Sequence, residues 1–154
     1  IVFKMGVAGA AKKVPPETDY VLTAETKGIP LAEELARALG MDRYIVARKS
    51  VKAYMENALW VDDVSITTKG TQKLCLDGTD IERIKGKNVL LLDDVISTGG
   101  SMKALVELTE KAGGKVIGQA CVLAEGNAAK RDDIIFLEPH ERACRCRSLM
   151  RSEP

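Results

Sequence analysis

The sequence predicts an α/β fold in which a parallel β-sheet is flanked by helices and carries an inserted, flexible β-hairpin. Short runs rich in β-branched and aromatic residues alternate with runs in which apolar residues recur at helical spacing. This alternation is typical of a parallel sheet. Residues 50–84 depart from it, with two short strand-like runs in place of a helix. The 154 residues are enough for about one domain, so we expect a single core.

The first half of the predicted sheet has two strands and the helix between them. Residues 20–24 (YVLTA) are predicted to form a buried strand. A helix is predicted over residues 29–39, where apolar residues keep helical spacing until Gly40. Residues 44–47 (YIVA) give the second strand. A further helix is expected ahead of the first strand.

The insertion at residues 50–84 is predicted to be a hairpin. Its two strand-like runs read VDDVSITT and TQKLCLDG, and Lys69–Gly70 lies between them as the turn. Connections in compact α/β proteins are usually much shorter than this one. We therefore interpret the hairpin as a functional flap rather than a packing element.

The second half of the sheet follows the insertion. A third strand is predicted at residues 89–92, then a helix over residues 102–112 that ends at Gly113. Residues 115–124 and 134–137 supply two more strands. Together these elements predict a core that ends near residue 138.

Residues 139–154 are expected to form a separate tail. Their sequence, PHERACRCRSLMRSEP, has neither strand nor helix periodicity. We predict that residues 1–138 form the core and that this tail is disordered.

Composition excludes several classes of function. The formal net charge is +1, so no broad basic surface argues for nucleic acid. No apolar run approaches the roughly 20 residues of a membrane span, and the first residues lack the order of a signal peptide, which predicts a cytoplasmic protein. His140 is the single histidine, which argues against a histidine-based triad or a multi-histidine metal site.

The stretch VLLLDDVISTGGS, residues 89–101, carries the most specific chemistry. Asp93 and Asp94 are predicted where a parallel strand ends, which is where ligands bind such sheets. The glycines and hydroxyls that follow lead into a helix N-terminus and suit a phosphate. Two carboxylates would repel that phosphate, so they are expected to face hydroxyl groups or Mg²⁺. The ligand implied is a sugar phosphate.

A structural alternative stands beside this interpretation. A shorter pattern of this kind is often only a helix cap, with Asp94 or Ser97 capping and the glycines making a turn. Neither a Walker loop nor a dinucleotide-binding glycine motif occurs in the sequence.

The full stretch resembles the signature of the type I phosphoribosyltransferases, which bind 5-phosphoribosyl-1-pyrophosphate (PRPP). TAETKG at residues 23–28 resembles the pyrophosphate loop of that family, and VARKS lies where the family places basic residues. The insertion corresponds to its flexible catalytic hairpin. ETKGIPLA, YIVARKSVK, SITTKGTQ and VLAEGNAAKRDDIIFL are most similar to the adenine-type purine branch. The resemblance covers about residues 19–137.

For PRPP, the resemblance implies that Asp93 and Asp94 hold the ribose hydroxyls and, through PRPP or water, assist Mg²⁺. The 5-phosphate would be held by Ser97, Thr98, Gly99, Gly100 and Ser101.

The resemblance also implies a pyrophosphate site, in a loop where the family often has a cis peptide. Its residues would be Glu25, Thr26, Lys27, Gly28, Arg48 and Lys49. Lys27 and Arg48 would join Asp93 and Asp94 as the catalytic set. Taken singly, Lys27 is more often a solvated lysine at a helix start, and Arg48–Lys49 is more often an exposed pair at a strand end.

Val95, Ile96 and Glu125 are the candidate base contacts. Glu125 stands where 6-oxopurine branches often have a lysine, and this favours adenine. The function implied is transfer of the 5-phosphoribosyl group from PRPP to a purine, with release of pyrophosphate in purine salvage. The family also implies a homodimer. The general base cannot be named from the sequence.

Two alternatives stay open. One is a non-catalytic, PRPP-sensing regulatory domain. The other is a chain that binds PRPP but turns over poorly, because the hood that selects the base is expected to be incomplete.

Overall fold

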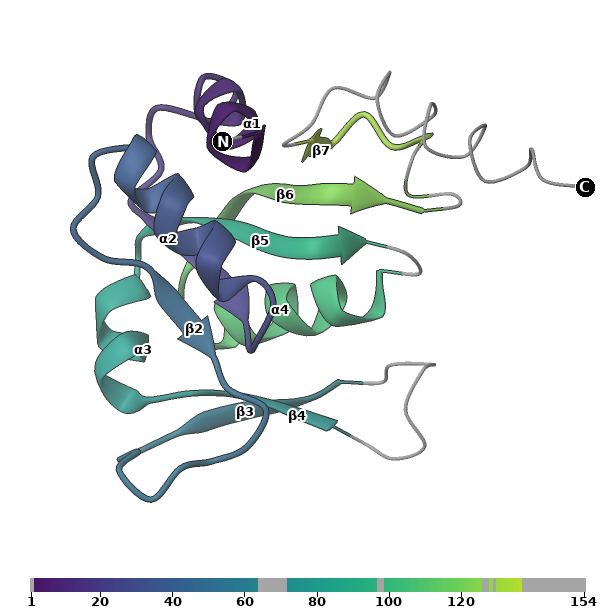
Figure 1. The fold of residues 1–154 in the computed structure, drawn as a ribbon. Helices are drawn as coiled ribbons and strands as arrows, with labels where there is room; N and C mark the ends of the chain where they lie inside the picture. The colour runs from purple at the N-terminus through teal and green to yellow at the C-terminus, as the bar shows by residue number, and fades with distance from the viewer. Residues whose placement is uncertain (1, 64–71, 97–98, 126–127, 129, 137–154) are drawn as a thin grey trace, which may run out of the picture.

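The structure is a computed structural model. It describes residues 2–63, 72–96, 99–125, 128 and 130–136 (Figure 1). The predicted tail at residues 139–154 and the Lys69–Gly70 turn lie outside these residues.

Within the described residues, the central sheet has five strands in the order β2-β1-β5-β6-β7. Every neighbouring pair in it is parallel, which confirms the predicted fold class. The strands are β1 (Tyr20–Ala24), β2 (Ile45–Ala47), β5 (Asn88–Ile96), β6 (Lys115–Ala124) and β7 (Ile134–Phe136).

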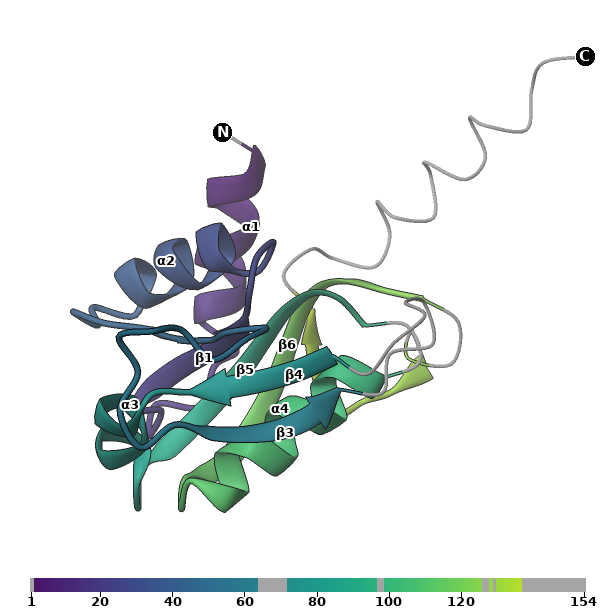
Figure 2. The ribbon, with the colours of Figure 1, turned by 90° about the horizontal axis from the view of Figure 1, so that it is seen from below.

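Helices cover both faces of the sheet because its central strands are apolar on both sides. Leu90 and Leu92 of β5 pack beneath α1 (Val2–Ala11) and α2 (Ile29–Ala38). Leu91 lies in the opposite core with α4 (Gly100–Lys111). Figure 2 shows α1 and α2 on one side of the sheet and α4 with the hairpin on the other. None of the described helices is both long and apolar enough to cross a bilayer.

The predicted hairpin is present as β3 (Leu59–Asp63) and β4 (Gln72–Leu76), paired antiparallel. Its inner face packs on the α4 side of the core through Val61, Leu74 and Leu76. A short helix that the sequence did not predict, α3 (Gly78–Ile84), follows within the same segment. Asp77 stands at its N-cap and accepts a 3.0 Å hydrogen bond from the Glu56 N–H.

The structure corrects one boundary that matters for the site. We predicted that the third strand ends at residue 92, but β5 continues to Ile96. Asp93, Val95 and Ile96 pair in register with Cys121, Leu123 and Ala124 of the long strand β6. The two acids therefore lie inside a strand near its carboxyl end, where backbone pairing holds them, rather than in the loop beyond it.

Candidate functional site

The predicted site residues gather where the chain leaves the sheet in two directions. From β1 it passes through α2 to β2 on one side, and from β5 it passes through α4 to β6 on the other. Since β1 and β5 are parallel neighbours, the segments that follow them start at the same edge (Figures 1 and 2). Such a switch point is where ligands of open parallel sheets bind.

The loop after β1 packs against its own strand. The Glu25 N–H donates to the Ala47 carbonyl of β2 at 2.9 Å, and the Glu25–Thr26 peptide is cis, as the resemblance implied. A Cβ added at Gly28 would lie 2.0 Å from Thr23 Oγ1. The close approach of loop and strand therefore requires glycine at residue 28.

Thr23 is fully buried beneath this loop. Its Oγ1 finds no hydrogen-bond partner in the structure as far as it is described. Thr26 and Lys27 are exposed in the turn between β1 and α2. The loop thus has two exposed hydrogen-bond donors, Thr26 and Lys27, close to the buried hydroxyl of Thr23.

The carboxylate of Glu25 connects the loop after β1 to the segment after β2. Its Oε2 accepts the Lys49 N–H at 3.0 Å, and its Oε1 lies 3.4 Å from Arg48 Nη1. The hydrogen bond from Lys49 lowers the pKa of Glu25, and the charges of Lys52 and Arg48 add to this effect against partial burial. Glu25 therefore already has partners within the protein.

Asp93 and Asp94 form a second polar group at the end of β5. The Asp94 N–H donates to Asp93 Oδ1 at 2.8 Å. Burial, with the side-chain hydrogen bond and the negative charge of Asp94, raises the pKa of Asp93 to about 7. The hydrogen bond from the Asp94 backbone N–H and the charge of Lys49 act in the opposite direction. Because the charge of Lys49 acts on Asp93, the residues that follow β2 lie near the acids at the end of β5.

The N-terminus of α4 is partly described. Gly99 caps the helix with φ +82°, a backbone conformation that favours glycine. Its carbonyl accepts the Lys103 N–H at 2.9 Å. Gly100 and Ser101 form the first turn, while Ser97 and Thr98 lie outside the described residues.

The candidate base contacts differ in exposure. Val95 is 37% exposed and pairs in register with Leu123, which is 38% exposed. Ile96 is only 2% exposed and belongs to the core around α4. Of the two, Val95 is therefore the more accessible to a ligand. The sequence analysis missed Leu123, since only the pairing of β5 with β6 places it beside Val95.

Glu125 lies at the end of β6. Its N–H donates to the Ile96 carbonyl at 2.9 Å, and the residue is exposed. It therefore lies close to the end of β5 with a carboxylate that can meet a ligand.

The predicted Mg²⁺ fits this edge only as an ion shared with a substrate. Among the residues that the structure describes, no group of three or more His, Cys, Asp or Glu could hold a metal. Two adjacent carboxylates do suit Mg²⁺ that is bound mainly by substrate phosphates and water.

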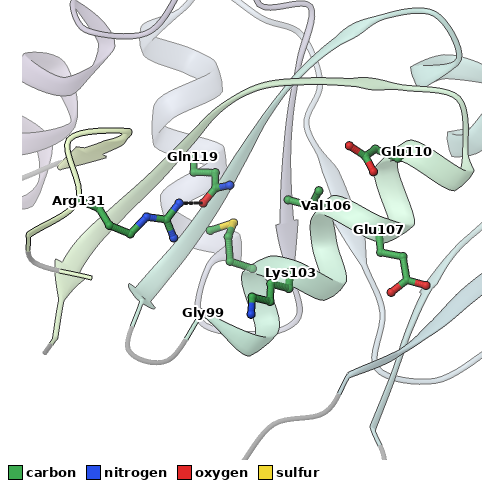
Figure 3. A pocket seen from close by; sticks show the side chains of 8 residues that line it. Gly99, Lys103, Val106, Glu107, Glu110, Gln119 and Arg131 are labelled. Carbon is green, nitrogen blue, oxygen red and sulfur yellow. Dashed lines mark hydrogen bonds between the residues drawn. The ribbon is translucent and has the colours of Figure 1, made fainter. Parts of the chain in front are cut away.

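A further pocket lies between α4, Gln119 of β6 and Arg131, and it meets this edge at Gly99 (Figure 3). Arg131 extends across it toward Gln119, with Nη2 to Oε1 at 3.5 Å. Its lining consists of Gly99, Met102, Lys103, Val106, Glu107, Glu110, Gln119 and Arg131. Gly99 is the one predicted site residue among these, so we do not assign the pocket to the predicted site.

Comparison with known proteins identifies the family. A model of the phosphoribosyl transferase domain matches residues 3–142. The hypoxanthine/guanine phosphoribosyltransferase of Methanothermococcus okinawensis is 37% identical over 111 residues, which cover 72% of this chain and 56% of that protein. The corresponding enzyme of Methanococcus voltae is 31% identical over 120 residues, 78% of this chain and 60% of that protein. The chain thus spans less than two thirds of these relatives.

Solved structures agree on the fold. The adenine phosphoribosyltransferase of Thermoanaerobacter pseudethanolicus superimposes with a TM-score of 0.71 at 25% identity, over 88% of this chain and 78% of that chain. The adenine enzyme of Rhodothermus marinus gives 0.70 at 25% identity, over 86% and 76%. The similar sequences and the similar structures are therefore named for different purine bases.

The contact between Gly28 and Thr23 gives the first prediction. We expect Gly28→Ala to lower the free energy of unfolding by about 1–3 kcal/mol, because the new methyl group overlaps Thr23 Oγ1. Thr23→Ala in the same chain should recover most of this loss, since the nearest remaining atom, Thr23 Cβ, lies 3.3 Å away. Urea unfolding of the two single variants and the double variant tests this. Simple additivity of the two losses would contradict it.

The raised pKa of Asp93 gives the second prediction. Its ordinary value is 3.8 and its value in the fold is about 7, so between these pH values the folded state binds more protons than the unfolded state. Asp93 therefore makes the free energy of unfolding fall as pH rises through this window, by at most about 1.4 kcal/mol per pH unit. Asp93→Asn should remove that contribution. Urea unfolding at pH 5, 6, 7 and 8 measures it.

Asp132→Asn is the matched control, because Asp132 is an exposed acid outside the predicted site. Its pH profile should stay parallel to that of the unmodified protein. If the Asp93→Asn profile also stays parallel, Asp93 is not the group responsible.

Proposed function

The chain belongs to the phosphoribosyltransferase family, and from that premise we propose that it transfers the 5-phosphoribosyl group of PRPP to a purine base and releases pyrophosphate. The observation that carries this proposal is the meeting of two charged groups at one sheet edge. Asp93 and Asp94 lie at the end of β5. Arg48 and Lys49 follow β2, and the charge of Lys49 acts on Asp93.

The three parts of PRPP suit three parts of this edge. We assign the 5-phosphate to the N-terminus of α4 and to residues 97–101, because backbone N–H groups there can donate to an anion. The ribose hydroxyls go to Asp93 and Asp94, since carboxylates accept hydrogen bonds from hydroxyls. The pyrophosphate goes to Thr26, Lys27 and Gly28, with Arg48 and Lys49 as cations.

The reaction exchanges one bond at the anomeric carbon for another. The bond from this carbon to pyrophosphate breaks and its electron pair leaves with the pyrophosphate. A ring nitrogen of the base forms the new bond, and the proton of the imidazole N–H passes to the released pyrophosphate or to solvent. Lys27 and Arg48 stabilise the negative charge on the leaving group. Asp93 and Asp94 keep the ribose in place and face the positive charge that develops on it. Mg²⁺, carried by PRPP, would neutralise further phosphate charge.

The hairpin of β3 and β4 fits the role of a cover. Exclusion of water would protect the cationic ribose from hydrolysis. The hairpin packs on the core through its inner face. We propose that this arrangement brings it over the bound PRPP.

For the base we propose adenine. Val95 and Leu123 offer an adjacent, exposed apolar surface for the flat face of a purine. The carboxylate of Glu125 at the end of β6 can accept a hydrogen bond from a 6-amino group, whereas it would repel a 6-oxo group. The names of the hypoxanthine/guanine relatives favour a 6-oxopurine instead, so the assay must include both kinds of base.

On the family resemblance we also propose that the protein is a cytoplasmic homodimer.

The function has a direct test. With PRPP and Mg²⁺, we expect pyrophosphate release to be fastest with adenine among adenine, hypoxanthine and guanine. Asp94→Asn should lower kcat/KM by about 10²-fold, as loss of a group that faces transition-state charge commonly does. Asp132→Asn should change it little.

Each other outcome excludes part of the proposal. Faster release with hypoxanthine or guanine would refute adenine and leave the transferase. PRPP binding without release with any base would favour the PRPP-sensing alternative. No binding of PRPP would refute the donor assignment.

The apolar base surface has its own test. We expect Leu123→Ser to raise the KM for the base by about 10-fold, since burial of one such side chain against a ligand contributes about 1.5 kcal/mol. The KM for PRPP should stay unchanged. Because Leu123 is 38% exposed, the fold should tolerate the change, and urea unfolding checks this. An equal rise in both KM values would place Leu123 outside the base site.

A further inference from the structure

Glu25 joins the loop after β1 to the end of β2, and Arg48 continues this link to β4. Its N–H donates to Ala47 at 2.9 Å, and its carboxylate holds the Lys49 N–H at 3.0 Å and the Arg48 guanidinium at 3.4 Å. Arg48 in turn forms an isolated bridge with Cys75 of β4. In that bridge the Arg48 N–H donates to the Cys75 carbonyl at 2.9 Å, and the Cys75 N–H donates to the Arg48 carbonyl at 2.7 Å.

These contacts make Glu25 a poor ligand for pyrophosphate. Each of its carboxylate oxygens already has a partner in the protein, and a second anion beside it would be repelled. The role that remains is to fix the backbone and side chain of the cationic segment. Resting on the function proposed above, we propose that Glu25 is a positioning residue that fastens Arg48, Lys49 and the attached hairpin strand to the loop after β1.

The hydrogen bond to Lys49 carries more of this role than the ion pair does. The side chains of Arg48 and Glu25 are 34% and 21% exposed, and partly exposed ion pairs contribute little to stability. The Lys49 bond joins a backbone N–H to a charged acceptor, which is the stronger kind of hydrogen bond. An uncharged acceptor at residue 25 should therefore preserve much of the geometry.

The bridge to Cys75 extends the effect to the hairpin. Cys75 is fully buried, and its neighbours Leu74 and Leu76 are anchored in the core around α4. β4 therefore gives the Arg48 backbone a firm support on one side, and Glu25 gives it one on the other. Loss of Glu25 removes only the support that Glu25 gives and leaves the support from β4. The chain should therefore fold, while Arg48 and Lys49 become less well placed.

The test compares Glu25→Ala with Glu25→Gln. We expect Glu25→Ala to raise the KM for PRPP about 10-fold, as expected for loss of one hydrogen bond of this strength, and to lower kcat as well, because Arg48 is then less well placed to stabilise the leaving group. Glu25→Gln should restore the KM to within about 2-fold, because its amide oxygen can accept the Lys49 N–H. A lower KM in both variants would mean that the carboxylate merely repels pyrophosphate, and no change in either would mean that it has no role. Either result overturns the proposal.

Amide hydrogen exchange separates this inference from the proposed function. Exchange at the Lys49 N–H should be about 10-fold faster in Glu25→Ala than in the unmodified protein, and near normal in Glu25→Gln. This readout needs no turnover, so it supports or refutes the fastening even if the chain proves inactive. Unchanged exchange at Lys49 in Glu25→Ala would overturn the proposal.

Glu34 supplies the matched control. It pairs with Arg37 at 3.4 Å on α2, the same distance as the pair of Glu25 with Arg48. Glu34→Ala should change neither the KM for PRPP nor the exchange of Lys49. If it changes both as Glu25→Ala does, the effect reflects general loss of charge rather than positioning.

Discussion

The parallel pairing of β1 with β5 is the constraint on which the rest of the structure depends. Leu22 pairs with Leu91, and Thr23 pairs with Leu92, all within strands that are buried on both faces. Each buried leucine contributes about 1.5–3 kcal/mol relative to an exposed one, so this register is strongly favoured. It places the end of β1 beside the end of β5. The loop that starts at Glu25 and the acids at the end of β5 therefore begin at the same edge of the sheet.

The charges at this edge are arranged in a way that suits a ligand with unlike parts. The cations Arg48 and Lys49 follow β2, with Glu25 as their counter-charge within the protein. The acids lie on β5, where burial raises the pKa of Asp93 to about 7. A molecule with phosphates at both ends and hydroxyls between them matches this order. A molecule of uniform negative charge would meet Asp94 and Asp93 without compensation.

Local patterns in the sequence predict much of this architecture. The alternation of strand-like and helical runs indicates the parallel sheet, and Gly99 and Gly100 mark the start of α4. The predictions that fail depend on pairing between distant segments. β5 extends to Ile96 because β6 is long enough to pair with it, and the same extension buries Ile96 against α4. Leu123 becomes a neighbour of Val95 only through this register, which shifts at Val89–Leu90. The partners of Glu25 come from after β2, so no local pattern predicts them.

The base is less firmly determined than the donor for a physical reason. The proposed donor site uses backbone geometry, the close packing of Gly28 on Thr23 and charges attached to the sheet core. Val95 and Leu123 present only carbon atoms, so they can bind the face of a purine but cannot distinguish its 6-amino from its 6-oxo form. That distinction requires a hydrogen-bonding group at the edge of the ring. Glu125 lies at the end of β6 with an exposed side chain, and a carboxylate there accepts from an amino group and repels a carbonyl oxygen. A site for hypoxanthine or guanine would need a donor in its place, so in the site proposed above the preference for adenine would come from this one side chain.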